Sequence, residues 1–398
     1  MADMTVRERF RAVMSFEPGS RTLLWEFGYW AATLERWYGE GLRRSWYALP
    51  PGYAAGSSIF GEALPFPHVV HRSGVARTRD LDVHQTCNLD AGAVRIPITW
   101  RLWPIFQETV LKEDETTKLQ INADGVTCMV KKDADSLPQF LDWPVNDRGS
   151  WEKIKEERLG RDIVGRFPPR WEALAKSYKD RDYPLGVGLD SFFSTPRELF
   201  GLVRQLTMYY DDPKLMHDIG EHLASLWLAM LEEVTSKVDL DFAYFWEDMS
   251  FKNGPLMSPR MFAEFVVPYY QRVTGFLRAR GVEIIFVDTD GDCQLLIPGF
   301  LQAGVSGLYP FEVQAGMDIV EVRKQYPRLL MQGGLDKIKL RLGKEAIDAE
   351  LEAKLPFMLT QGGYIPYCDH LVPPDVPWDN FLYYRQRVQE FVERYVQV

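Results

Sequence analysis

The sequence has few cysteines and no long apolar run. Its four cysteines, Cys87, Cys128, Cys293 and Cys368, lie far apart and form no CxxC pair, which excludes a disulfide framework and favours reduced thiols in the cytoplasm. The longest nearly continuous apolar stretch, residues 223–231, is far shorter than the roughly 20 residues of a membrane span. The N-terminal segment carries charges where a secretory signal would be apolar. We therefore expect a cytoplasmic protein that has no membrane partner.

Basic stripes and phosphate-binding loops are missing as well. Asp and Glu total 56 against 46 Lys and Arg, which gives a net charge of −10 and disfavours nucleic acid as a partner. No GxGxxG or GxxxxGK motif follows an apolar segment, so a nucleotide-binding loop is not indicated. The chain consists of 398 residues, 46% hydrophobic and 13% aromatic, a composition typical of a globular enzyme.

Short apolar segments alternate with amphipathic helices in the C-terminal half of the chain. Start signals mark helices at Thr195, Asp212-Pro213 and Ser258-Pro259. Strands and helices that alternate with short connections indicate βα units and a parallel sheet. A further strand at 23–27 brings the count to seven, and eight would close a TIM barrel, with a doubly wound open sheet as the alternative. The other predicted strands are 183–189, 242–246, 282–287, 307–309, 329–331 and 364–366, and further helices are predicted near 318–326, 344–360 and 378–395.

The predicted fold is α/β, a TIM (β/α)8 barrel with an inserted antiparallel β ribbon near the N-terminus. Residues 1–398 would form this single domain, and residues 40–145 would form a loop and β-ribbon insertion. Within the insertion, 93–103 and 116–130 alternate apolar and polar residues, as the strands of a ribbon do. The insertion could form a lid over the mouth of the barrel.

Acidic residues follow nearly every predicted strand. In a βα barrel the carboxyl ends of the strands open on one face, which carries the active site, so about ten carboxylates would meet at one mouth with few cations among them. Clustered acids repel one another unless a metal, a cationic ligand or shared protons neutralise them. The residues expected at the mouth are Glu26, Asp190, Glu247, Asp248, Asp288, Asp290, Asp292, Glu312, Asp336, Lys337, Cys368, Asp369 and His370.

Several of these residues also have an ordinary structural interpretation. Acids after strands often cap helices, which is our interpretation of Asp190 and Asp336. A lone cysteine such as Cys368 is usually a small buried hydrophobe, although His370 two residues later makes a metal site conceivable. The aromatic residues of the N-terminal region would mostly pack in the core or in a lid, and those that face the mouth would favour a flat aromatic substrate.

Three stretches carry a family resemblance. VEIIFVDTDGDCQLLIPGFLQAGVSGLYPFE, GGLDK and GGYIPYCDHLVPPDVPWDNFLYY resemble the uroporphyrinogen decarboxylase superfamily, and the resemblance extends over residues 180–398. It implies a TIM barrel that acts as a haem-pathway decarboxylase or as a corrinoid-dependent methyltransferase. The decarboxylases begin with an Arg-rich segment of the type RQAGRY, where this chain has TLLWEFGYWAATLERWY. Because an acidic mouth would also repel a polyanionic substrate, the methyltransferase branch of the O-demethylase type is favoured.

The resemblance also implies a metal site. In the methyltransferase branch, zinc is held by a His-x-Cys-Gly motif after the sixth strand and by a cysteine after the last strand. The first motif reads Asp288-Thr289-Asp290-Gly291 here, and the late cysteine matches Cys368. Oxygen ligands make a harder site, which suits an oxygen-bearing substrate. We therefore expect Asp288, Asp290 and Cys368 to bind zinc and to leave one position open for the substrate.

The expected function is transfer of a methyl group from a methoxylated aromatic or a methylamine-type substrate to a corrinoid on a separate protein. An ether oxygen is a poor leaving group, so it needs a proton or a Lewis acid as negative charge develops. A metal-independent decarboxylase and a non-catalytic ligand-binding barrel are the alternatives, and a homodimer is left open. The expected catalytic residues are Glu247, Asp248 and His370, and the expected substrate-binding residues are Trp25, Glu26, Tyr29 and Glu312.

Overall fold

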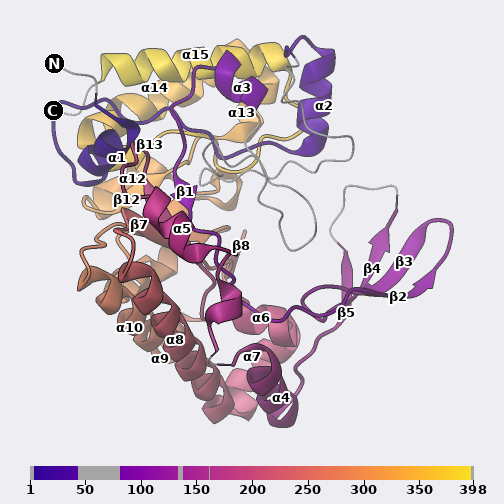
Figure 1. Ribbon diagram of the computed structural model, residues 1–398. Helices are drawn as coiled ribbons and strands as arrows, with labels where there is room; N and C mark the ends of the chain where they lie inside the picture. The colour runs from indigo at the N-terminus through magenta and orange to yellow at the C-terminus, as the bar shows by residue number, and fades with distance from the viewer. Residues whose placement is uncertain (1–3, 44–80, 133–137, 161, 396–398) are drawn as a thin grey trace.

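A curled sheet of seven parallel strands forms the centre of the computed structural model (Figure 1). The structure describes residues 4–43, 81–132, 138–160 and 162–395. The strands of this sheet lie side by side in the order in which they occur in the sequence, as successive βα units do, and the sheet is compatible with a TIM-like barrel. In their order across the sheet, the strands are β1 (Val94–Arg95), β6 (Leu185–Leu189), β7 (Phe242–Trp246), β10 (Ile285–Thr289), β11 (Gly307–Pro310), β12 (Leu330–Gln332) and β13 (Tyr364–Ile365).

The six strands predicted in the C-terminal half are confirmed. β7 has the predicted bounds, whereas β10 begins at Ile285, three residues later than the predicted start at 282. The side chains of Phe286 and Val287 are both fully buried, although they point to opposite faces of the sheet. Burial on both faces explains why these strands are continuous apolar runs rather than alternating ones.

The segment 22–30 lies between the two edges of the sheet. Leu24 O accepts a hydrogen bond from Asp90 N, near β1, at 3.0 Å, and Tyr29 forms a parallel bridge with Val372, beyond β13. The predicted strand at 23–27 is not a regular strand, because Leu24 N donates to the Asp90 carboxylate at 2.8 Å rather than to a backbone carbonyl. The segment nevertheless joins both edges, as the closure of a barrel would require.

An aromatic core fills the inside of the curled sheet. Phe10 of α1 (Val6–Met14) stacks on Trp25, and it meets Phe242, the first residue of β7, edge-on; both centroid distances are 5.7 Å. Helix α1 therefore covers the amino end of the sheet, and the carboxyl ends of the strands remain for a functional site. The core consists of Phe10, Val13, Met14, Leu23, Trp25, Phe27, Ala93, Phe242, Tyr244, Ile284, Phe286, Tyr309, Leu330, Ile365 and Tyr367.

Helices surround the sheet, with α8 to α10 on one flank and α13 to α15 on another (Figure 1). The predicted starts at Asp212 and Ser258 are confirmed, because each side chain accepts a hydrogen bond from an amide in the first turn of its helix. Thr195 is not a cap, since its helix already begins at Ser194. No helix in the described part of the chain is long and apolar enough to cross a membrane. The remaining helices are α2 (Ala31–Gly39), α3 (Leu81–Thr86), α4 (Arg148–Arg158), α5 (Trp171–Ser177), α6 (Ser194–Phe200), α7 (Leu202–Asp211), α8 (Pro213–Thr235), α9 (Pro259–Phe265), α10 (Val267–Arg278), α11 (Ile297–Gln302), α12 (Ile319–Gln325), α13 (Lys337–Leu342), α14 (Lys344–Gln361) and α15 (Trp378–Arg394).

An antiparallel ribbon projects from the body of the molecule (Figure 1). The strand pair expected within 116–130 is present as β3 and β4, but 93–103 is not part of the ribbon, because β1 pairs with β6 of the main sheet. The predicted insertion at 40–145 therefore contains a strand of the main sheet, and its residues 44–80 lie outside the described part of the chain. The ribbon strands are β2 (Thr109–Glu113), β3 (Thr117–Ile121), β4 (Thr127–Lys131) and β5 (Gln139–Asp142), and a separate hairpin pairs β8 (Ser250–Phe251) with β9 (Gly254–Pro255).

Candidate functional site

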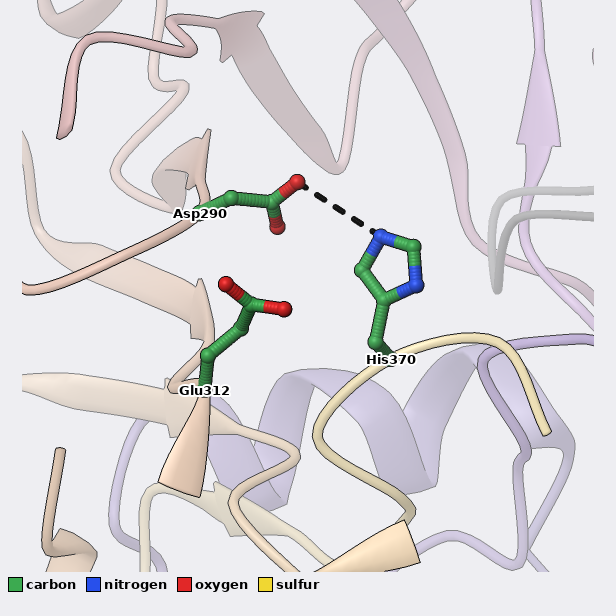
Figure 2. Close-up of side chains that lie close together, drawn as sticks. All are labelled: Asp290, Glu312 and His370. Carbon is green, nitrogen blue, oxygen red and sulfur yellow. Dashed lines mark ion pairs between the residues drawn. The ribbon is translucent and has the colours of Figure 1, made fainter. Parts of the chain in front are cut away.

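Two carboxylates and one imidazole meet beyond the carboxyl ends of the strands. Asp290 follows β10, Glu312 follows β11 and His370 follows β13, and their side chains point toward one another (Figure 2). The ligand atoms of the three residues all lie within 4.8 Å of one another, and Nε2 of His370 is 3.5 Å from Oδ2 of Asp290. No other group of three potential metal ligands this close was found within the described ranges. We call these three residues the acidic triad.

The backbone of Gly291 holds the carboxylate of Glu312 in the acidic triad. Its amide donates a hydrogen bond to Oε2 of Glu312 at 3.0 Å. Gly291 has a φ of +75°, and a Cβ at this position would lie 2.5 Å from the carbonyl oxygen of Ser250, so a side chain has no room there. The glycine of the DTDGD run is therefore required for the turn that places Asp290 beside Glu312.

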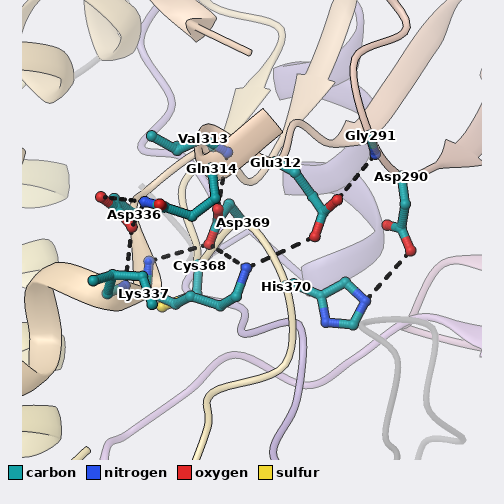
Figure 3. A network of polar contacts seen from close by, with 12 residues as sticks. Asp290, Gly291, Glu312, Val313, Gln314, Asp336, Lys337, Cys368, Asp369 and His370 are labelled. Carbon is teal, nitrogen blue, oxygen red and sulfur yellow. Dashed lines mark hydrogen bonds and ion pairs between the residues drawn. The ribbon is translucent and has the colours of Figure 1, made fainter. Parts of the chain in front are cut away.

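A buried carboxylate, that of Asp369, connects the loops that carry Glu312 and His370. Asp369 is fully buried and accepts hydrogen bonds from the amides of Val313 at 2.9 Å and Lys337 at 3.1 Å. Val313 directly follows Glu312, and Asp369 directly precedes His370. Asp369 therefore fixes the loops after β11 and β13 relative to each other and to the start of α13 (Figure 3).

The charges of the acidic triad shift the pKa values of its members. Burial lowers the pKa of His370, but the hydrogen bond to Asp290 and the negative charges of Asp290 and Glu312 outweigh burial and raise it. Burial raises the pKa of Glu312, and the charge of Asp290 adds to this effect, while the Gly291 amide and Lys337 oppose it. The triad is thus a concentration of negative charge that a cation would stabilise.

Two further acids, Asp288 and Asp248, lie beside the triad. Burial and the charges of Asp290 and Asp248 raise the pKa of Asp288 well above its usual value. Burial also raises the pKa of Asp248, although Arg197 pairs with this carboxylate at 2.9 Å. The structure therefore brings Asp248, Asp288, Asp290, Glu312 and His370 together at one mouth, as expected from the strand ends.

Glu247 has a different environment from its neighbour Asp248. Its carboxylate is fully buried and accepts hydrogen bonds from the hydroxyls of Ser191 at 2.7 Å and Tyr270 at 2.9 Å. The amides of residues 192–194 donate to the same carboxylate. Burial raises its pKa, and these hydrogen bonds oppose the increase. Glu247 therefore connects β7 to the start of α6, and its hydrogen-bonding capacity is used within the protein.

Glu26 and Cys368 also lie outside the acidic triad. Glu26 is buried, pairs with Arg385 of α15 at 3.1 Å and accepts a hydrogen bond from Cys368 N at 2.9 Å. The thiol of Cys368 is fully buried, and burial followed by the charge of Glu26 raises its pKa well above the usual value. Of the predicted zinc ligands Asp288, Asp290 and Cys368, the structure thus places only Asp290 in the triad.

The predicted aromatic contacts with substrate lie in the core. Trp25 is fully buried against Phe10 at the amino end of the sheet, and Tyr29 is buried against Trp37 and Phe381 on the outer side. The aromatic ring next to the triad is instead Phe27, whose centroid lies 5.2 Å from that of His370. Phe27 was not among the predicted site residues, although it is the last residue of the strand predicted at 23–27 and lies two residues before the bridge that Tyr29 forms with Val372.

Cations are more numerous at the mouth than the sequence suggested. Arg101 pairs with Asp190 at 2.7 Å and lies over the ring of Trp246, and Arg197 lies over the same ring. Arg95 donates a hydrogen bond to the hydroxyl of Tyr244. The expectation of few cations is wrong, because arginines from β1, the loop after it and α6 reach the mouth.

The two acids interpreted as helix caps have different roles. Asp190 forms the ion pair with Arg101. Asp336 is confirmed as the cap of α13, where it accepts a hydrogen bond from the Ile338 amide at 2.9 Å.

The donor set of the acidic triad fits a divalent metal ion. Carboxylate oxygens and an imidazole nitrogen are common ligands of zinc and related ions. Three protein ligands leave a fourth position for a substrate atom. The side chains of Asp290, Glu312 and His370 are 36%, 26% and 25% exposed, so a ligand can approach from solvent. Asp290, Glu312 and His370 are therefore the residues that could hold a metal.

Comparisons with known proteins identify the family. The model of the family described as uroporphyrinogen decarboxylase (URO-D) matches residues 118–391. A methyltransferase from Methanosarcina mazei has a similar fold, with a TM-score of 0.57 and 16% identity over 97% of this chain and 100% of that chain. A putative vitamin-B12-independent methionine synthase from Listeria monocytogenes matches with a TM-score of 0.33 and 12% identity over 56% of this chain and 69% of that one. No curated protein matches. The chain belongs to the uroporphyrinogen decarboxylase (URO-D) family.

Proposed function

We propose that this chain is a corrinoid-dependent methyltransferase of the O-demethylase type. It would move a methyl group from a methoxylated aromatic or a methylamine-type substrate to a corrinoid carried by a partner protein. The observation that carries the proposal is the acidic triad, Asp290, Glu312 and His370, at the carboxyl ends of the strands, where barrel enzymes place their chemistry. The fold shared with a methyltransferase from Methanosarcina mazei supports it.

The chemistry of the methyl donor explains the need for the triad. When a methyl group leaves an ether for cobalt(I), the oxygen gains negative charge and needs a Lewis acid or a proton. A divalent metal such as zinc, held by Asp290, Glu312 and His370, would supply that Lewis acid. Oδ2 of Asp290 lies 3.5 Å from Nε2 of His370, so these two ligands are already close together.

The surroundings of the triad favour an aromatic donor. Phe27 lies against His370 and is also near Tyr309 and Tyr367, with centroid distances of 6.5 and 6.1 Å. Tyr309 and Tyr367 are fully buried behind Phe27, so Phe27 would be the ring that a substrate contacts beside the polar triad. A methoxylated ring would have one apolar face and one polar oxygen to match. Asp288 and Asp248, the other acids of the mouth, would then contact the polar substituents of the substrate.

Decarboxylation of an acidic substrate is the second candidate. The cations at the mouth favour it, since Arg95, Arg101 and Arg197 could bind carboxylates. Two of these arginines, however, already pair with Asp190 and Asp248 of the chain itself. Their positive charge is therefore largely neutralised, which leaves methyl transfer as the function that the site supports best.

A direct assay separates the two candidates. The zinc-loaded protein is incubated without oxygen with cob(I)alamin and a panel of methoxybenzoates, methoxyphenols and methylamines, and the absorbance change on formation of methylcobalamin is recorded. We expect methyl transfer from at least one methoxylated aromatic and no conversion of uroporphyrinogen to coproporphyrinogen. Decarboxylation of uroporphyrinogen together with no methyl transfer from any donor would contradict the proposal.

A further inference from the structure

A lysine lies at the edge of the acidic triad. Lys337 is the first residue of α13, and its Nζ is 3.8 Å from Oε1 of Glu312 and 3.3 Å from Oδ1 of Asp369 (Figure 3). Its side chain is only 15% exposed. The ammonium group is therefore held in a fixed position between a buried carboxylate and one member of the triad.

Asp369 fixes the position of the ammonium group of Lys337. It is fully buried, so its charge depends on the donors around it, and both the amide and the ammonium of Lys337 donate to Oδ1. The Val313 amide donates to the other oxygen, Oδ2. Because this carboxylate is tied to the backbone at two places, the lysine keeps its distance from Glu312.

The two carboxylates of the triad are consequently unlike. Both oxygens of Glu312 have a donor nearby, since Oε2 accepts from the Gly291 amide and Oε1 faces Lys337. The Oδ2 atom of Asp290 faces the imidazole of His370. An ammonium group competes with a metal ion for carboxylate lone pairs and repels a divalent cation through charge. Glu312 is therefore the weaker of the two oxygen ligands.

We propose that Lys337 is a positioning residue that makes Glu312 the exchangeable ligand of the metal centre. On arrival of the donor atom of the substrate, Glu312 would give up its position as a ligand, and Lys337 would stabilise the freed carboxylate. This is a ligand exchange in which no covalent bond to carbon changes and no electron is transferred. The inference rests on the metal centre of the proposed function, because it assigns a role to the residue behind one of its ligands.

Metal affinity tests this role without any substrate. The affinity for Zn²⁺ is measured by competition with a chromophoric chelator for the wild type, Lys337→Met and Lys337→Gln. Removal of the positive charge should tighten Zn²⁺ binding by about 10-fold or more, the size of effect expected for residues behind metal ligands. Lys337→Gln keeps a donor for Asp369, so it serves if Lys337→Met fails to fold. In the methyl-transfer assay, kcat should fall in both variants, because Glu312 no longer leaves.

Two control variants separate charge from position. Lys339→Met removes the same charge from the same helix two residues further on, and it should leave the Zn²⁺ affinity unchanged. Lys337→Arg retains the charge and should bind Zn²⁺ like the wild type. Unchanged or weaker binding in Lys337→Gln, with binding by the wild type intact, would overturn the role of Lys337 alone. If neither the wild type nor the variants bind Zn²⁺, the metal centre and the role of Lys337 are both wrong.

Discussion

Replacement of His370 by alanine is expected to release the bound metal and to lower methyl transfer by about 100-fold or more. His370 is the only nitrogen donor of the acidic triad, and a centre left with two carboxylates holds zinc weakly. Zinc affinity and methylcobalamin formation measure the two effects. His217→Ala is the matched control, because this histidine stacks on Phe265 in the outer helical layer, with a centroid distance of 4.6 Å. Equal losses in both variants would contradict the assignment.

A cysteine variant decides between the two possible ligand sets. The family resemblance implies that Cys368 binds zinc together with Asp288 and Asp290, whereas the structure buries its thiol next to Glu26 and outside the triad. Cys368→Ser should therefore keep the zinc affinity of the wild type. A loss as large as that of His370→Ala would restore Cys368 as a ligand.

Replacement of Arg385 by methionine is expected to destabilise the protein by about 3–5 kcal/mol, the cost of breaking a buried ion pair by removing one partner. Arg385 and Glu26 have side chains that are 2% and 1% exposed. Burial already raises the pKa of Glu26, and the charge of Arg385 opposes this increase. Without Arg385, the Glu26 carboxylate must take up a proton or stay charged and buried. The free energy of unfolding, obtained from urea denaturation, measures the cost.

A second arginine of α15 provides the control for this measurement. Arg387 lies two residues further on and pairs with Asp348 at 2.7 Å, with side chains that are 20% and 31% exposed. Arg387→Met should cost less than about 1 kcal/mol, because solvent screens exposed ion pairs. The double replacement of Glu26 by Gln and Arg385 by Met should recover part of the stability. Similar costs for Arg385→Met and Arg387→Met would show that burial of the pair has no special effect.

The sheet could be predicted where the sequence signal is local. Phe242–Trp246 forms β7 with the predicted bounds because all of its residues are apolar and a strand of a parallel sheet is buried on both faces. The alternating pattern of 93–103 predicts a ribbon strand, but Val94–Arg95 belongs to the main sheet. A strand of two residues leaves no detectable period, and its partner Leu185 is distant in sequence. The run Thr195-Pro196-Arg197-Glu198 has the pattern of a capping box and predicts a helix start at Thr195, but the helix starts one residue earlier.

The position of the site could be predicted from the sequence, but the role of each acid in it could not. Acids after β7, β10 and β11 do gather at one mouth, because the strand ends fix where they lie. Whether an acid is free for chemistry depends on partners far away in the sequence: Glu26 pairs with Arg385, and Glu247 accepts hydrogen bonds from Ser191 and Tyr270. No local pattern indicates such partners, so the sequence alone predicts that these two acids contact the substrate or act on it.

The metal content of the purified wild-type protein shows whether the acidic triad is a metal centre. Protein isolated without chelators is analysed for zinc and for other divalent transition metals, and the amount is expressed per chain. We expect about one equivalent, the amount for a single site with three protein ligands. Protein that catalyses methyl transfer but contains no metal would contradict it, and the acidic triad would then have to act by proton transfer.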